Sequence, residues 1–150
     1  MLIMIAVLAI PSTGLAAGLL WNGVPLPENL RIVRPQPDIT RNVAAFSGKW
    51  EGWWGNTNEL PSILVVEEIH DSGALRVVAV YAWGVSRAWG ISKAGWVRVP
   101  GTLANGAVHL KGRLSGARVT YRMNGGSLNG LYDDNGKFTR GVFRRAPITR

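Results

Sequence analysis

The stretch that decides the fold is Gly-Lys-Trp-Glu-Gly-Trp-Trp-Gly, residues 48–55, which holds three of the seven tryptophans of this 150-residue chain. Side chains alternate between the two faces of a β-strand, so Trp50, Gly52 and Trp54 share one face and the residues between them share the other. From here almost to the C-terminus, apolar and polar residues alternate in short runs that end in turn-forming residues. The stretch therefore predicts the first strand of an all-β domain.

The alternation predicts three further strands, at about Ser62–Ile69, Leu75–Trp83 and Gly95–Leu103. The third strand of the domain is apolar on both faces, which is typical of a central strand. The fourth contains Pro100-Gly101, where we expect a β-bulge. Four more strands follow, joined by three hairpin turns.

The first hairpin has a testable register. A two-residue loop at Ser115-Gly116 pairs Leu110 with Tyr121 and Arg113 with Arg118, so apolar side chains gather on one face and polar side chains on the other. The next turn, within Asn124–Gly126, keeps the same faces with either two-residue loop. We therefore expect one inner and one outer face along this hairpin.

The last turn, residues 133–136, allows two registers. An Asn135-Gly136 loop points Phe143 and Arg145 inward, whereas a three-residue loop points Val142 and Arg144 inward. In either case the chain has eight sequential antiparallel strands. These predict an eight-stranded up-and-down β-barrel, with an open β-sandwich as the alternative.

The N-terminal 45 residues precede the barrel domain, which we place at residues 46–146 with a tail at 147–150. Residues 2–21 carry no charge, and an apolar run is followed by a break and by small residues, as in a signal peptide. We assign residues 1–17 to a signal peptide or an N-terminal anchor and residues 18–45 to a proline-rich linker. The protein is expected to be exported, to the periplasm or the extracellular space, with membrane anchoring as the alternative.

Gly48-Lys49-Trp50 resembles the G-x-W signature of lipocalins and their calycin relatives. The resemblance implies a closed barrel in which Trp50 plugs one end and an arginine near the end of the last strand, Arg144 or Arg145, packs over it. The region from Phe46 to Gly84 also resembles small exported bacterial proteins of unassigned function, which implies a location outside the cytoplasm.

The aromatic residues form the first candidate site. Tryptophan and tyrosine rings offer apolar surfaces for stacking, and each carries one N–H or O–H group. Such rings suit a small apolar or amphipathic ligand held inside a barrel. Packing of the same rings into a filled core is the alternative, and Trp89, on a loop, is the least suited to it. The candidate ligand-binding residues are Trp54, Tyr81, Trp83, Trp89, Trp96 and Tyr121.

A basic face forms the second candidate site. The net charge is +8, and residues 106–150 carry nine basic and only two acidic side chains. Such asymmetry indicates an anionic partner. For an exported protein this would be anionic lipid or acidic polysaccharide; nucleic acid is not expected, because the face lacks interleaved aromatic residues. The face consists of Lys111, Arg113, Arg118 and Arg122.

No pattern of catalytic residues is evident. The chain has two histidines and no cysteine, which gives no basis for a metal site or another cofactor. Glu67 and Glu68 are adjacent and should point to opposite faces of a strand, so they cannot act together as acid and base. We therefore expect a binding protein for a small ligand rather than an enzyme, with a surface-interaction module as the alternative.

Overall fold

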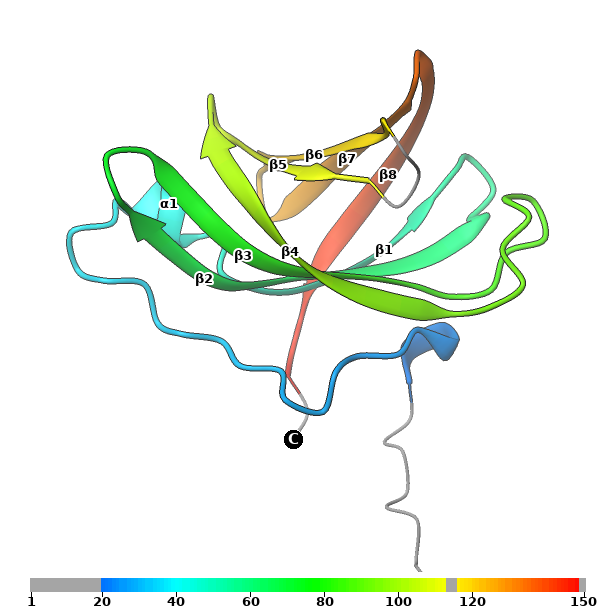
Figure 1. Ribbon diagram of the computed structural model, residues 1–150, viewed down its shortest axis with the longest axis horizontal. Coiled ribbons are helices and arrows are strands. Elements are labelled where there is room, and N and C mark those ends of the chain that lie inside the picture. The colour runs from blue at the N-terminus through cyan, green and yellow to red at the C-terminus, as the bar shows by residue number, and fades with distance from the viewer. Residues whose placement is uncertain (1–19, 113–115, 149–150) are drawn as a thin grey trace, which may run out of the picture.

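The computed structural model describes residues 20–112 and 116–148, and within them the chain forms a closed barrel of eight antiparallel strands (Figure 1). Each strand pairs with the next in sequence, and the last pairs with the first. The predicted up-and-down barrel is confirmed, and the sandwich alternative is not the fold. The strands are β1 Gly48–Trp54, β2 Leu60–Asp71, β3 Leu75–Trp83, β4 Gly95–Ala104, β5 Ala107–Lys111, β6 Arg118–Asn124, β7 Ser127–Asp134 and β8 Lys137–Ala146.

Strand β1 has the predicted two faces. Trp50, Gly52 and Trp54 are buried inside the barrel, whereas Glu51 and Trp53 are half-buried on the outside. Inside, the Trp54 ring lies against strands β7 and β8 at two paired glycines, Gly130 and Gly141. Only glycine fits there, because a Cβ atom on Gly130 would stand 2.6 Å from the Trp54 ring. This part of the interior is therefore filled by side chains.

The β5–β6 hairpin has the predicted faces but not the predicted register. Val108 pairs with Tyr121, Leu110 with Val119 and Lys111 with Arg118, so the two-residue loop at Ser115-Gly116 was wrong. Just beyond the two strands, the Gly112 backbone N–H donates to the Ala117 carbonyl at 2.8 Å. The actual register differs from the predicted one by two residues, a shift that leaves every side chain on its face.

The other two hairpins follow the sequence signals. β6 and β7 are joined through Gly125-Gly126, and β7 and β8 through Asn135-Gly136, where both residues have positive φ as a type I′ turn requires. The first of the two predicted registers for the last strand is therefore the one adopted. It brings Phe143 and Arg145 to the inner face and leaves Arg144 on the outside.

The irregularity of the sheet lies in β2 and not in β4. The β3–β4 register runs through Pro100 and Gly101 without a shift, so the bulge expected there is absent. The β2–β3 register instead shifts between Val66 and Glu68. The extra residue, Glu67, lies with Glu68 along the same outer groove, so the prediction that these two carboxylates point to opposite faces was wrong.

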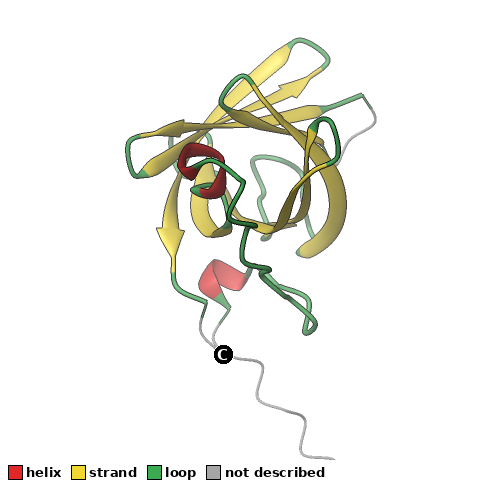
Figure 2. Ribbon diagram, turned by 90° about the vertical axis from the view of Figure 1, so that its left-hand side faces the viewer, coloured by secondary structure: helices red, strands yellow, loops and turns green. Residues whose placement is uncertain are grey.

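The segment before the barrel packs against it. A short 3₁₀ helix, η1 (Trp21–Gly23), and one turn of α-helix, α1 (Arg41–Ala44), mark its two ends, and α1 stands in front of the strands in Figure 2. Between them Val24, Leu26, Leu30 and Ile32 cover an apolar outer surface of β2 and β3 made by Ile63, Val65, Val80 and Ala82. The segment follows this side of the barrel in Figure 1. We call residues 20–33 the strap.

The predicted signal peptide or anchor, residues 1–17, lies outside the described residues. Within the described ranges, no helix has the length and apolar character needed to cross a membrane.

Candidate binding site

Trp54 and Tyr121, two of the predicted ligand-binding residues, lie in the centre of a packed aromatic cluster. The Trp54 ring centroid is 5.9 Å from that of Tyr121 and 5.0 Å from that of Phe143, in tilted and edge-to-face geometry. Tyr132 adds a further edge-to-face contact to Trp54 at 5.9 Å. All four rings are buried, so this cluster forms the core at the β1, β6, β7 and β8 side of the barrel.

Two polar atoms of this cluster have no hydrogen-bond partner among the described residues, namely Trp54 Nε1 and the Tyr121 hydroxyl. Burial raises the pKa of Tyr121 well above its ordinary value, and the neighbouring Tyr81 and Tyr132 raise it further. Tyr121 is therefore neutral and packs as a core residue.

Three other predicted residues continue the aromatic wall toward the β3–β4 loop. Tyr81 and Trp83 are buried neighbours on β3, with ring centroids 5.8 Å apart, and the Trp83 indole donates to the Lys93 carbonyl. Trp89, on the loop, packs edge-to-face on Tyr132 at 5.2 Å. Its indole N–H donates to Glu59 at 3.2 Å, so the loop is held against the end of the barrel.

Trp96 is separated from this group. It alternates with the inward Gly95 and Val97 on β4, points outward, and is 40% exposed. The guanidinium of Arg98 lies 5.9 Å from its ring centroid. The structure thus brings together Trp54, Tyr81, Trp83, Trp89 and Tyr121, but places Trp96 on the other side of the sheet.

Trp50 occupies the opposite end of the barrel from Trp89. Its indole donates to the Phe46 carbonyl at 3.0 Å, and the Arg145 guanidinium lies 4.2 Å from its ring centroid. Arg145 also donates to the carbonyl oxygens of Ser47 and Ala45. Arg145, and not Arg144, therefore covers Trp50 and ties the last strand to the start of the first.

Strands β4 and β5 diverge beyond a short paired region. β5 pairs with β4 only at Thr102, Leu103 and Ala104, so residues 95–101 have no β5 partner among the described residues. Val97 shares the face of Tyr81 and yet is 36% exposed. The barrel wall is consequently opened on one side, where a strand of ten residues meets one of five.

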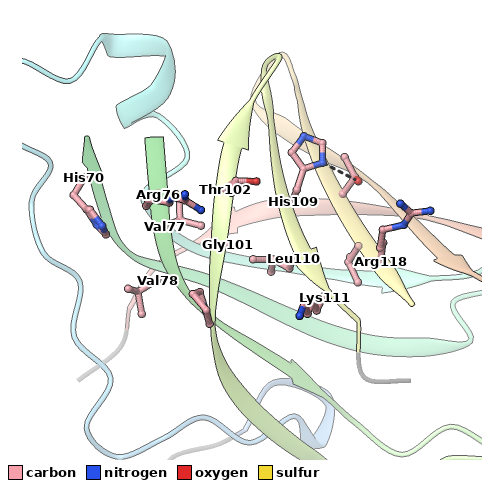
Figure 3. A pocket seen from close by; sticks show the side chains of 13 residues that line it. His70, Arg76, Val77, Val78, Gly101, Thr102, His109, Leu110, Lys111 and Arg118 are labelled. Atoms are coloured by element: carbon pink, nitrogen blue, oxygen red, sulfur yellow. Dashed lines mark hydrogen bonds between the residues drawn. The ribbon is translucent and has the colours of Figure 1, made fainter. Parts of the chain in front are cut away.

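A cleft of about 540 Å³ lies at this divergence (Figure 3), and we call it the β4–β5 cleft. Its volume is in the range of small-molecule sites. Apolar walls come from four strands, β3 to β6. Gly101, which has no side chain, lets Leu110 approach the β4 backbone at the point of divergence. The apolar lining residues are Val77, Val78, Pro100, Leu110 and Val119.

The polar rim of the cleft is basic. Arg76 of β3 stands on one side, and Lys111 of β5 and Arg118 of β6 stand on the other (Figure 3). His70 and His109 also line it, and no carboxylate is among the described lining residues. The Asp133 carboxylate lies 3.6 Å from the exposed Arg118 side chain, in an ion pair that neutralises Arg118 weakly. The cleft therefore presents an apolar interior beneath a positive rim.

The predicted basic face divides at this cleft. Lys111 and Arg118 are paired across β5 and β6 and line it. Arg122 lies outside the lining and donates to the Asn105 carbonyl at 2.6 Å, and Arg113 lies outside the described residues. Sequence reasoning missed Arg76 because it lies more than 30 residues before Lys111 and Arg118 in the sequence. A signal for the short β5 was present, since only five residues separate the Asn105-Gly106 turn from Gly112.

A buried acid holds the strap to the barrel. Glu67 accepts hydrogen bonds from Arg98 Nε at 2.7 Å and from the Arg31 backbone N–H at 3.1 Å. Burial raises the pKa of Glu67, but the hydrogen bonds and charges of Arg98 and Arg31 outweigh it and hold that pKa below the ordinary value. This carboxylate is therefore ionised and structural. No metal-binding cluster of His, Asp or Glu occurs in the part of the chain that the structure describes.

No known protein-family model matches the sequence, and no curated protein matches it significantly.

Proposed function

We propose that this protein is a non-enzymatic binding protein that holds a small anionic amphiphile, such as a fatty acid, in the β4–β5 cleft. The composition of the cleft carries the proposal. It joins an apolar lining to Arg76, Lys111 and Arg118, with no carboxylate among the described residues that line it. An alkyl chain gains about 0.8 kcal/mol for each methylene removed from water. A carboxylate head at the rim would meet three cations that retain access to solvent.

Binding in the cleft requires no rearrangement of the core. A ligand inside the barrel at Trp54 would have to displace rings that contact one another at 5.0–5.9 Å. Large-to-small changes in such cores cost about 3–5 kcal/mol, which indicates how much packing a ligand there must replace. We therefore propose the cleft, and not the aromatic interior, as the first binding site.

A calycin-like assignment and export are parts of the same proposal. Gly48-Lys49-Trp50 at the start of β1, Arg145 over Trp50 and the closed eight-stranded barrel support the first. The uncharged apolar run of residues 2–10 supports the second. An exported protein of this kind would meet fatty acids or single-chain lipids at the cell envelope.

Isothermal titration calorimetry with laurate, below its critical micelle concentration, tests the proposal. We expect saturable binding with a stoichiometry of one, weakened by salt because the rim is exposed. Affinity should increase from hexanoate to laurate, and dodecanol should bind more weakly than laurate. Lys111→Glu should weaken laurate binding by about tenfold or more, because a repulsive charge replaces an attractive one. The matched control is Arg122→Glu, which changes the same charge on the adjacent strand outside the cleft.

Two results would contradict the proposal. Equal loss of affinity in the Lys111 and Arg122 variants would indicate a diffuse surface charge effect rather than a site. Equal affinities for acetate and laurate would show that the apolar walls take no part in binding.

A further inference from the structure

A second groove, of about 650 Å³, lies on the outer face of β1 and β8 beside the end of the strap. None of the described residues lines both this groove and the β4–β5 cleft. Its composition also differs, because it combines two tryptophans with arginines, asparagines and one glutamate. We call it the β1–β8 groove.

The aromatic part of this groove is made by Trp21 of η1 and Trp53 of β1. Their ring centroids are 5.7 Å apart at an interplanar angle of 60°. Such an edge-to-face pair occupies at most one face of either ring, and both residues are only half-buried. Val142, paired with Trp53 across β1 and β8, is 54% exposed and extends the apolar floor. The groove therefore offers flat apolar surface to a ligand.

The charged part flanks this floor. Arg140 and Arg144 lie two residues on either side of Val142 on the outer face of β8, and both are exposed. Among the described residues neither has an ion-pair partner. Glu51, opposite Arg144, is instead paired with Lys49 at 2.8 Å. Two guanidinium groups thus remain free to bind carboxylate.

The remaining polar groups are suited to hydroxyls. Asn56 and Asn58, on the β1–β2 turn, supply amides that both donate and accept, and Glu51 supplies an acceptor. A sugar hydroxyl can donate a hydrogen bond to Glu51, whereas a phosphodiester has no donor to offer. This favours a sugar over a nucleic acid, although both stack on aromatic rings.

We propose that the β1–β8 groove binds an acidic oligosaccharide, with sugar rings stacked on Trp53 and Trp21 and uronate carboxylates held by Arg140 and Arg144. The proposal is independent of amphiphile binding, because it concerns different residues on a different face. If both sites are used, the protein can hold an amphiphile while attached to an acidic glycan.

Calorimetric titration with a defined oligogalacturonate tests the inference, with a neutral galactose oligomer of the same length beside it. We expect saturable, salt-sensitive binding of the acidic oligomer and at least tenfold weaker binding of the neutral one. Arg140→Gln with Arg144→Gln should reduce affinity for oligogalacturonate by at least tenfold. Trp53→Ala should reduce it similarly, and Trp53→Phe should retain part of it. Laurate binding and far-ultraviolet circular dichroism in each variant show whether the fold is intact.

Lys111→Glu is the reciprocal control, and it should leave oligogalacturonate affinity unchanged. The inference would be overturned by no binding of oligogalacturonate, by equal binding of the neutral oligomer, or by tighter binding of a single-stranded oligothymidylate. Loss of affinity only in the Lys111 variant would also overturn it, because the glycan would then bind at the cleft. Failure of laurate binding alone would contradict the proposed function and leave this site intact.

Discussion

Replacing Gly130 with Ala should destabilise the barrel, because Trp54 occupies the space that a methyl group would need. A Cβ atom at Gly130 would lie 2.6 and 2.8 Å from two atoms of the Trp54 ring and 2.9 Å from Phe143. Real Cβ atoms do not approach so closely, so the rings must shift. They have little room to do so, because Trp54 is in contact with Tyr121 and Tyr132 on its other sides.

The expected cost can be bounded. Overpacking a well-filled core costs about 1–3 kcal/mol. Alanine recovers about 0.4–1 kcal/mol relative to glycine by restricting the unfolded chain. The difference spans about 0–2.6 kcal/mol, and because all three contacts at 2.6–2.9 Å are too short we expect Gly130→Ala to lower the free energy of unfolding by about 1–2 kcal/mol. Gly126→Ala is the matched control, since a Cβ there meets nothing within 4 Å, and it should raise the free energy of unfolding by about 0.4–1 kcal/mol.

Guanidinium denaturation followed by far-ultraviolet circular dichroism measures these values without depending on tryptophan emission. The decisive comparison adds Trp54→Leu, which is itself destabilising but frees space beside β7. Gly130→Ala should cost less in that background, with a coupling energy of about 1 kcal/mol. Strictly additive effects, or a neutral Gly130→Ala, would refute the reasoning. Either result would mean that room exists between Trp54 and the barrel wall.

Two further predictions concern Arg145 and Glu67. Arg145→Ala removes the guanidinium over Trp50 and its hydrogen bonds, and should lower the free energy of unfolding on the order of 1 kcal/mol, whereas Arg144→Ala should change it by less than about 0.5 kcal/mol. Folding lowers the pKa of Glu67 below its ordinary value of 4.5. The ionised Glu67 carboxylate therefore stabilises the folded state fully when the pH is above 4.5, and this stabilisation is lost as the pH falls through the pKa of Glu67 in the folded state. Denaturation at a series of pH values should therefore show a steeper acid loss of stability in the parent than in Glu67→Gln; parallel curves would contradict this assignment.

The fold was largely predictable, because the alternation of side chains determines which face each residue takes. Trp50 and Trp54 lie inside and Trp53 lies outside, as the period of two requires. The β5–β6 register was not determined in the same way, since a shift by two residues leaves the faces of Leu110 and Tyr121 unchanged. The β-bulge at Glu67 carries no glycine or proline, so no turn signal revealed it.

The candidate site was predictable only in part. Sequence reasoning found the basic character of Lys111 and Arg118, because charge is a property of the sequence. It could not find their proximity to Arg76, which depends on how far β5 continues beside β4. Nor could it show that Trp54 is surrounded by rings, because filling of a barrel depends on side-chain volumes across strands. The prolines of residues 18–45 predict a linker, but the strap packs on the barrel and brings Trp21 into contact with Trp53.

The most direct test of the account is a ¹H–¹⁵N correlation titration of the protein with laurate. Binding in the β4–β5 cleft predicts saturable shifts at the backbone amides of Val78, Thr102, Lys111 and Thr120, with the indole N–H signal of Trp54 unchanged. Saturable shifts confined to the Trp54 indole and the Tyr121 amide, with the cleft amides unaffected, would place the ligand inside the barrel and contradict the proposal.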